Sequence, residues 1–592
     1  MDTPAAATGA GGSATWAAQP SSGDWNTAAN WVPAGVPTNT AVFGPSSQTT
    51  IGFGPGTGAT VAEIAFVSGA PPYAFVFGSP APNVPLLTIT GDGISNGSTN
   101  AQRLIVASSA VTYRQEQLKF AGAASAGTSD VSYFVGPAGS AAPGGGVIGF
   151  YDQSTAGSAA FTVTTGAGTP DPKSTVGGEV SFSDSASAGT ARFTVYGSTS
   201  TTDGDTFGNV VFHDTSTAAD GTFTNAGGTV AGGDGGNTQF YDDATAGSGK
   251  YYNVGATVQG ANGGDVAIDG TANAGNGRFH NYAATASGGY GGVTSFNNNP
   301  PALGTVTSGA SAGSGQFYNH GAAAAGQGGG HTFFTAKYGS PTGADCTVVN
   351  YGAAVAASAS CAGHTVFSIS LPQSAAYCPD AGSGTFWNFP GTVNGAPGGY
   401  TEFAVYTDQG APIAGSNGPT AADGTFINLG AFAAGASGGS TIFSGTSNAA
   451  NARLIATGGV NGAAGGSIVF YDSATGGAAS VSLSGNGTLD ISHYGQATLT
   501  IGDLEFAPGC IRTTLGTATP CLVLSGTLAL AGSPAAFYFE TGPGFTGNTW
   551  YTVLSAPNLA NFSATQFSGN STSQGSPTFR IVGNELQVSF TA

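Results

Sequence analysis

Large apolar residues recur along the chain in pairs, with small and polar residues between them. A first apolar position, usually Phe, is followed by a partner position, and in eight of twelve units the two are 11 residues apart. The first positions are Phe120, Phe150, Phe182, Phe212, Phe240, Ile268, Phe296, Phe334, Phe367, Phe403, Phe443 and Phe470. The partner positions are Val131, Phe161, Phe193, Phe223, Tyr251, Phe279, Phe317, Val348, Phe386, Phe426, Leu454 and Val481. A β-branched residue usually stands two positions before the first Phe, which is the alternation of a strand with one buried face.

The spacing between units predicts how these strands stack. Phe443 and Phe470 are 27 residues apart, and Phe403 and Phe443 are 40 residues apart. A chain that returns to the same register in every turn forms parallel strands about 4.8 Å apart, with identical residues stacked on each other. Stacked repeats of this kind bury one continuous core. We therefore expect an all-β fold, a parallel β-helix (solenoid) of about 27–40 residues per coil with capped ends.

Changes in the pattern divide the chain into four segments. These are a Trp-rich N-terminal cap over residues 1–44, irregular first coils over 45–117, the repeat β-helix over 118–500, and C-terminal coils with a cap over 501–592. Trp16, Trp25 and Trp31 fall in the first segment, where we expect them to cover the open edge of the first coil. The alternative is that their rings stack on sugars.

Two polar columns accompany the apolar ones. Asn follows the partner position by two in seven consecutive units, at Asn225, Asn253, Asn281, Asn319, Asn350, Asn388 and Asn428. A buried Asn needs partners for its amide, and stacked amides supply them to each other. We expect an inward ladder, with ordinary surface turns as the alternative.

A second column, of aspartates, follows the first apolar position by two residues, at Asp152, Asp184, Asp214, Asp242 and Asp472. These carboxylates either cap turns in water or bind Ca²⁺, the only cofactor that the sequence leaves open.

Composition excludes some function classes. The formal net charge is −19, and the 11 Lys and Arg residues are scattered without a basic cluster. Nucleic-acid binding needs such a cluster, so we expect none. The chain has no apolar run of 18 residues, so we expect no transmembrane segment. Aromatic residues make up 10% and charged residues only 7%, which suits a packed chain better than a disordered one.

The five cysteines form no CxxC pair, which argues against a zinc ribbon. Cys510 and Cys521 flank a short loop, and we expect that they close a disulfide. The odd count leaves at least one thiol free, and the pairing of Cys346, Cys361 and Cys378 stays open. The segment from Asp2 to Ala7 is typical of a mature N-terminus, so we expect export.

Several segments resemble a known group of proteins. They are Gly23–Trp31 (Gly-Asp-Trp-Asn-x-Ala-x-Asn-Trp), Leu87–Ser98, the Thr-Ala-Gly-x-Ala-x-Phe repeats such as Ser154–Phe161, Trp550–Ala556 and Ile581–Val588. The sequence is similar to bacterial autotransporter-like passengers with autotransporter-associated β-strand repeats. The resemblance implies that the β-helix is right-handed and that the protein is secreted or lies at the bacterial cell surface.

Four consecutive units carry enlarged loops between the two strands, from about Asn297 to Asp423. Insertions in solenoids often collect on one binding face. The loops contain the residues that we expect to bind a ligand, which are Lys337, Tyr338, Tyr377, Asp380, Tyr406 and Asp408. The alternative is decoration without function. His331 and His364 occupy equivalent outward positions, with Tyr400 next, but lack a third metal ligand, so we expect no metal site.

The sequence offers no close carboxylate pair in a recognisable catalytic pattern, so we expect a protein that is not an enzyme. Three functions fit. The first is an extracellular surface or structural rod, an adhesin-like passenger, whose loop cluster binds a ligand. The second is a self-assembling filament or surface-layer subunit. The third is a polysaccharide-binding or polysaccharide-degrading β-helix. The partners that we expect are the cell surface, a glycan or a second copy of the chain.

Overall fold

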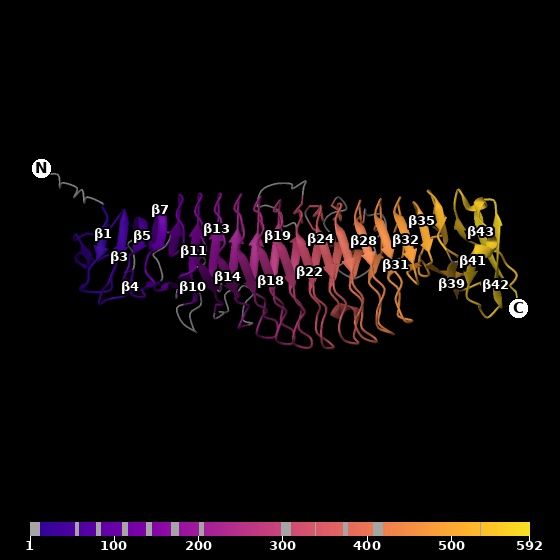
Figure 1. Ribbon diagram of the computed structural model, residues 1–592, viewed down its shortest axis with the longest axis horizontal. Helices are drawn as coiled ribbons and strands as arrows, with labels where there is room; N and C mark the ends of the chain where they lie inside the picture. The colour runs from indigo at the N-terminus through magenta and orange to yellow at the C-terminus, as the bar shows by residue number, and fades with distance from the viewer. Residues whose placement is uncertain are drawn as a thin grey trace. The chain divides into compact units, whose positions relative to one another are not determined.

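The computed structural model describes residues 12–53, 58–78, 85–108, 116–137, 145–166, 177–200, 206–297, 309–337, 339–370, 377–406, 418–532 and 534–591. The chain divides into two compact units, Met1–Val266 (unit 1) and Ala267–Ala592 (unit 2). Within each unit, short strands of successive coils lie side by side, and the helices of the described residues are single 3-10 turns (Figure 1). The predicted all-β parallel β-helix is therefore confirmed in each unit.

Unit 1 has two sheets, one from the first strand of each coil (sheet A) and one from the second (sheet B). Sheet A contains β1 (Ala14–Trp16), β2 (Trp31–Val32), β3 (Thr40–Phe43), β5 (Ala59–Phe66), β7 (Leu87–Asn96), β9 (Leu118–Phe120), β11 (Val147–Phe150), β13 (Glu179–Phe182), β15 (Asn209–Phe212) and β17 (Asn237–Phe240). Sheet B contains β4 (Thr50–Gly52), β6 (Ala74–Phe77), β8 (Gln102–Ser108), β10 (Val131–Pro137), β12 (Ala160–Val163), β14 (Arg192–Val195), β16 (Thr222–Asn225) and β18 (Lys250–Asn253). Strand β19 (Asp265–Asp269) crosses the boundary between the units.

Unit 2 repeats this plan and adds a third sheet. Its sheet A contains β21 (Val293–Asn297), β23 (His331–Ala336), β25 (His364–Ser370), β27 (Tyr400–Tyr406), β29 (Ser440–Phe443), β31 (Ser467–Phe470), β33 (Thr488–Asp490), β36 (Cys510–Leu515), β39 (Ala535–Thr541) and β41 (Phe567–Gly569). Its sheet B contains β20 (Arg278–Asn281), β22 (Gln316–Asn319), β24 (Thr347–Asn350), β26 (Thr385–Asn388), β28 (Thr425–Asn428), β30 (Arg453–Ala456), β32 (Ser480–Ser484), β35 (Leu504–Ala507) and β38 (Leu528–Leu530). The third sheet contains β34 (Thr498–Ile501), β37 (Cys521–Leu524), β40 (Tyr551–Ser555), β42 (Ser576–Val582) and β43 (Glu585–Thr591).

Antiparallel strands close the first coil of unit 1 and the last coils of unit 2. Strand β2 follows the turn η1 (Ala28–Asn30) and pairs antiparallel with β1, and β43 pairs antiparallel with β40 and β42. The other 3-10 turns, all in unit 2, are η2 (Ala359–Cys361), η3 (Leu559–Asn561) and η4 (Ala564–Gln566). No helix among the described residues is long and apolar enough to cross a bilayer.

The three tryptophans of the first segment belong to the core. Trp25 is 0% exposed and Trp16 and Trp31 are each 1% exposed. Trp31 packs edge-on against the other two rings, with ring centroids 5.0 and 4.9 Å away. They therefore cover the first coil as expected, and the sugar-stacking alternative is wrong because the ring faces are not accessible.

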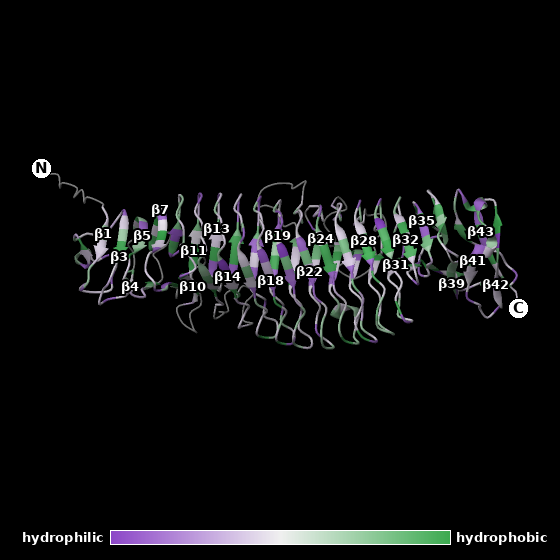
Figure 2. Cartoon of the chain, viewed as in Figure 1, coloured by the Kyte–Doolittle hydropathy of each residue, from purple (hydrophilic) through white to green (hydrophobic). Residues whose placement is uncertain are grey.

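The predicted phenylalanine columns form the centre of each unit. In unit 1 the ring of Phe182 stacks on Phe150 and on Phe212 with centroids 4.7 Å apart, and Phe193 meets it edge-on at 6.1 Å. In unit 2 Phe367 stacks in the same way on the ring of the preceding coil. Stacked and edge-on rings add to the stabilisation that burial alone gives. Figure 2 shows the strongly hydrophobic positions concentrated on the strands.

The asparagine column is the inward ladder that the sequence predicts. In unit 2, Asn319 Nδ2 donates to Asn350 Oδ1 at 2.8 Å, and Asn319 Oδ1 accepts from Asn281 Nδ2 at 2.8 Å. Asn225 and Asn253 make the same contact in unit 1 at 2.9 Å. All seven side chains are 0% exposed. Stacking thus satisfies amides that would otherwise be costly to bury, except at the last asparagine, whose Nδ2 has no hydrogen-bond partner among the described residues.

The aspartate column caps turns, which is one of the two alternatives from the sequence. Asp184 has φ of 57°, and its Oδ2 accepts the backbone N–H of Asp152 in the preceding coil at 3.0 Å. Asp214 accepts the N–H of Asp184 in the same way at 2.9 Å. Among the described residues, no group of three or more His, Cys, Asp or Glu side chains is placed to hold a metal ion.

This arrangement predicts a graded effect of substitutions at Asp184. Asp184→Ala should weaken the turn, because Ala at a positive φ costs roughly 1 kcal/mol and supplies no acceptor for the Asp152 N–H. Asp184→Asn should be mild, because Asn tolerates this conformation and keeps a side-chain oxygen. Asp184→Gly should lie between them. Hydrogen exchange at the Asp152 amide measures the loss, and equal exchange in all three variants would contradict the capping role.

One prediction from the cysteines is wrong. Cys510 and Cys521 are free thiols, as are Cys346, Cys361 and Cys378. Cys510 begins β36 in sheet A and pairs with Ala536, whereas Cys521 begins β37 in the third sheet and pairs with Thr498. The chain passes from sheet A to the third sheet between these two cysteines. Their closeness in sequence therefore does not place the two thiols side by side.

Candidate ligand-binding groove

The structure places the predicted loop residues only in part. Tyr338 and Asp408 lie outside the described residues, and Tyr406 is described only through its backbone at the end of β27. Lys337 is exposed directly after β23, and Tyr377 is half-buried. Neither Lys337 nor Tyr377 lines the groove that is described below.

The side chain of Asp380, the remaining one of the six predicted residues, forms hydrogen bonds with its own turn and with the adjacent coil. Its Oδ1 accepts the Thr342 hydroxyl at 2.6 Å and the Gly382 N–H at 2.9 Å. Burial raises the pKa of this carboxyl group, while the two hydrogen bonds act against that shift. Thr342 and Thr420 occupy the equivalent position in the adjacent coils. We therefore assign Asp380 to turn formation and not to ligand binding.

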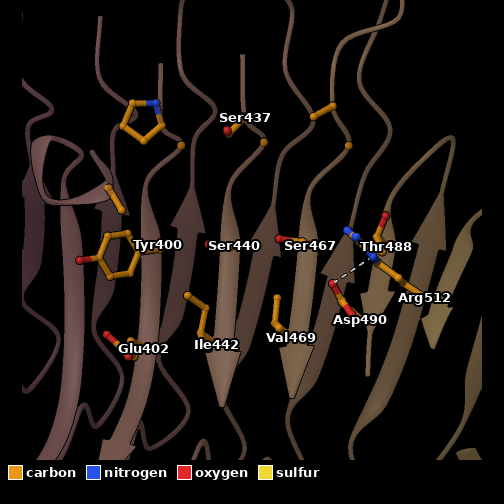
Figure 3. A pocket seen from close by; sticks show the side chains of 16 residues that line it. Tyr400, Glu402, Ser437, Ser440, Ile442, Ser467, Val469, Thr488, Asp490 and Arg512 are labelled. Atoms are coloured by element: carbon orange, nitrogen blue, oxygen red, sulfur yellow. Dashed lines mark ion pairs between the residues drawn. The ribbon is translucent and has the colours of Figure 1, made fainter. Parts of the chain in front are cut away.

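A groove with a volume of about 530 Å³ lies instead on the outer face of sheet A in unit 2 (Figure 3). Its floor is made by β27, β29, β31, β33 and β36, and its wall by the segments that lead into these strands. The lining residues are Ala359, Pro397, Gly398, Tyr400, Glu402, Ser437, Gly438, Ser440, Ile442, Ala464, Gly465, Ser467, Val469, Thr488, Asp490 and Arg512. None of the six residues predicted from the sequence is among them.

Two in-register columns form the floor of this groove. Their members stand at equivalent positions of neighbouring strands, because the pairing of sheet A keeps one register from β27 to β36. The column nearer the wall is Tyr400, Ser440, Ser467 and Thr488, and the second column is Glu402, Ile442, Val469, Asp490 and Arg512. The floor therefore has a row of hydroxyl groups beside an aliphatic centre with charged groups at its ends.

The wall is made of stacked glycine backbone. Gly398, Gly438 and Gly465 lie at equivalent positions of successive coils, and a Cβ on Gly398 would collide with the carbonyl oxygen of Gly438. The glycine pairs before each first strand thus allow the coils to approach closely. Beside these glycines the wall carries only small side chains and a proline ring, from Ala359, Pro397, Ser437 and Ala464.

Tyr400 ends a stack of rings. His331 and His364 stack with centroids 5.1 Å apart, and Tyr400 stacks on His364 at 4.9 Å with an angle of 2° between the planes. The next residue in the column is Ser440, so the floor drops beyond Tyr400 and its ring is seen face-on in Figure 3. Burial raises the pKa of Tyr400, with a smaller contribution from Glu402, so the phenol stays neutral. The equivalence of His331, His364 and Tyr400 was predicted and is confirmed by the strand register.

Arg512 closes the other end of the floor. Its Nε donates to Glu540 Oε1 at 2.8 Å and lies 3.9 Å from Asp490 Oδ2, the contact drawn as a dashed line in Figure 3. Nη2 also donates to Glu540, and the guanidinium lies over the Tyr538 ring at 5.2 Å. These partners raise the pKa of Arg512. The charge is therefore fixed in position and largely balanced by two carboxylates.

The carboxylates of the groove are too far apart to act as a glycosidase pair. Glu402 and Asp490 belong to β27 and β33, which are three strand spacings or about 14 Å apart. Retaining and inverting glycosidases need separations of about 5 and 6.5–9.5 Å. Ser492 donates to Asp490 at 2.7 Å and touches His493 at 3.0 Å, but serine and not imidazole bridges the three groups. In an activated serine nucleophile the imidazole lies between the serine hydroxyl and the carboxylate, which is not the arrangement here. The groove suits binding better than catalysis.

Sequence reasoning missed the groove although its columns are visible in the repeat. Tyr400 and Glu402 stand three and one residues before Phe403, at outward positions that can be aligned from coil to coil. Aligning the coils in this way predicts which outward residues form the floor of the groove. It does not show that the Gly-rich segments rise beside that floor and make it concave.

Neither protein-family models nor curated proteins give a match to this sequence. The function of the chain must therefore be argued from the geometry of its own residues.

A second group of rings lies on the outer face of sheet B in unit 2. His280 stacks on Tyr318 at 4.7 Å, and His320 lies between Tyr282 at 4.6 Å and Tyr351 at 5.2 Å. His280 Nδ1 and His320 Nε2 are 3.4 Å apart. Burial, and secondly the nearby His280, lower the pKa of His320 from 6.5 to about 4.

This shift predicts acid sensitivity. The folded unit holds His320 neutral, whereas the unfolded chain protonates near pH 6.5, so the stabilisation is complete above pH 6.5 and is lost as the pH falls toward 4. His320→Tyr keeps a ring like those of Tyr282 and Tyr351 but cannot take up this proton. The difference in melting temperature between pH 7.5 and pH 5 should therefore shrink in His320→Tyr. His493→Tyr, outside this stack, is the control, and an equal pH effect in both variants would refute the assignment.

Proposed function

We propose that the chain is an extracellular β-helix protein of a bacterial surface, adhesin-like and without enzymatic activity, which binds a glycan in the sheet A groove of unit 2. The observation that carries the proposal is the set of groups gathered in this groove. The Tyr400 ring, four serine and threonine hydroxyl groups, two carboxylates and a guanidinium surround an aliphatic floor in about 530 Å³. Ligand sites of this size combine apolar surface with a few placed polar groups.

Two further observations favour a glycan-binding surface protein over an enzyme or a filament subunit. The separation of Glu402 and Asp490 opposes glycan cleavage. Antiparallel strands cover the first coil of unit 1 and the last coils of unit 2, which disfavours end-to-end growth of a filament. The resemblance of the repeats to autotransporter-like passengers supports export to the cell surface.

The test is a glycan array followed by titration calorimetry on the bound glycans. Tyr400→Ala should weaken binding about tenfold or more, because the ring at the end of the floor is lost. Tyr400→Phe should bind nearly as the parent does, because the ring is kept. Tyr241→Ala is the matched control, since Tyr241 is an outward tyrosine of unit 1 that stacks on His213. Undiminished binding by a folded Tyr400→Ala protein would contradict the proposal.

A further inference from the structure

We infer that the groove takes a short, uncharged oligosaccharide lying parallel to the helix axis and rejects chains that contain uronic acids. The inference rests on the proposed glycan-binding function and specifies its ligand. It is carried by the in-register juxtaposition of Tyr400, the hydroxyl row and the two acidic groups at the edges of the Ile442–Val469 floor.

The charge of the site opposes an anionic ligand. Glu402 and Asp490 both line the groove, and Arg512 is the single cation among the lining residues. The guanidinium already bonds Glu540 and lies beside Asp490, so a ligand carboxylate would have to displace these partners. A ligand carboxylate near Glu402 or Asp490 would meet a like charge at short range, which is strongly unfavourable in a half-buried site.

An uncharged sugar meets complementary groups at the same places. Carboxylates accept hydrogen bonds from sugar hydroxyls, and charge-assisted hydrogen bonds are stronger than neutral ones. Ile442 and Val469 lie between the carboxylates and offer an aliphatic surface to the C–H face of a sugar ring. Tyr400 supplies an aromatic surface at one end of the same floor.

The register sets the direction and length of the ligand. Ser440, Ser467 and Thr488 repeat one hydroxyl per strand, so a chain that follows the axis meets a hydrogen-bonding group about every 4.8 Å. The floor ends at the Tyr400 ring, which stacks on His364, and at Arg512, which lies over Tyr538. These limits are four strand spacings or roughly 19 Å apart, which suits a short oligosaccharide and not an unlimited polymer.

The experiment compares matched neutral and oxidised sugars on the full chain. The probes are cellotetraose, maltotetraose and galactotetraose, and the same tetramers with their C6 alcohols oxidised to carboxylates. A chitosan tetramer tests a cationic chain. Calorimetry should show that the neutral form of each bound probe binds at least tenfold more tightly than its oxidised form. Added salt should narrow this ratio, because it screens charge repulsion.

Variants separate charge exclusion from shape. The double variant Glu402→Gln, Asp490→Asn keeps the shape of the floor and should admit the oxidised probes, while Glu505→Gln on sheet B should leave the ratio unchanged. Equal or tighter binding of oxidised probes by the parent protein would overturn the inference but leave glycan binding intact. Preference for the chitosan tetramer would assign the acidic groups to a cationic ligand and also overturn it. A protein that binds none of these probes and no glycan of the array would refute the proposed function itself.

Discussion

Phe182→Ala should destabilise unit 1 by about 3–5 kcal/mol, the range for removing a buried aromatic ring. Phe182 is 0% exposed and has a ring stacked against each of its faces. Neighbouring rings cannot close the gap, because each is held by its own coil at a fixed strand spacing. The cavity and the loss of two ring contacts therefore add to the lost burial.

The damage should remain local. Solenoid stability is approximately a sum of coil terms and contacts between neighbouring coils. Hydrogen exchange should therefore rise in the coils of Phe150, Phe182 and Phe212 and stay unchanged around Phe367 in unit 2. Phe432→Ala is the control, since that ring is 71% exposed. A uniform rise in exchange along both units would contradict nearest-neighbour stability.

The sequence predicted the core because the fold repeats it. Eleven of the twelve units contribute a Phe at the same register and one contributes Ile268, so the periodic pattern indicates both the strands and their stacking. The Asn ladder followed from the same periodicity. What the sequence did not show is that a facing threonine donates to the side-chain oxygen of six of the seven asparagines, the exception being Asn253, which faces Val266. Thr332 Oγ1 donates to Asn319 Oδ1 at 3.0 Å, and Thr365 makes the same contact with Asn350.

This pairing is visible in the sequence once the structure is known. Val163 and Val195 occupy the Asn column in unit 1, and the facing residues there are Val180 and Val210 instead of threonine. At this place in the core the chain thus uses an apolar pair in these two coils and a hydrogen-bonded pair in most of the later ones.

The candidate site was less predictable for a physical reason. A groove exists where one segment stands higher than the strand face beside it. The repeat pattern predicts the position of each residue along a strand but not how high the neighbouring segments stand. The glycines at 398, 438 and 465 indicate close approach of backbones, but they do not say which outward column lies beside them. The loops that the sequence favoured are described only in part, so Lys337 and Tyr377 keep no assigned role.

Asn319→Leu should cost unit 2 about 3 kcal/mol or more, because one substitution leaves several buried groups without partners. Asn319 Nδ2 donates to Asn350 Oδ1 and to the His364 carbonyl at 3.0 Å, and its Oδ1 accepts from Asn281 and Thr332. Leucine fills a similar volume but forms none of these bonds, and each buried group left unsatisfied costs about 1–3 kcal/mol.

Val195→Leu is the matched control, because Val195 holds the same column position in unit 1 but carries no hydrogen bond through its side chain. It should cost less than Asn319→Leu, through overpacking alone. Chemical denaturation gives the free energies, and hydrogen exchange in the coils of Asn281 and Asn350 locates the loss. Equal destabilisation by the two variants would mean that the column contributes shape and not hydrogen bonding. A larger loss at Asn319, centred on its two neighbouring coils, would establish that the amide ladder stabilises this part of the core.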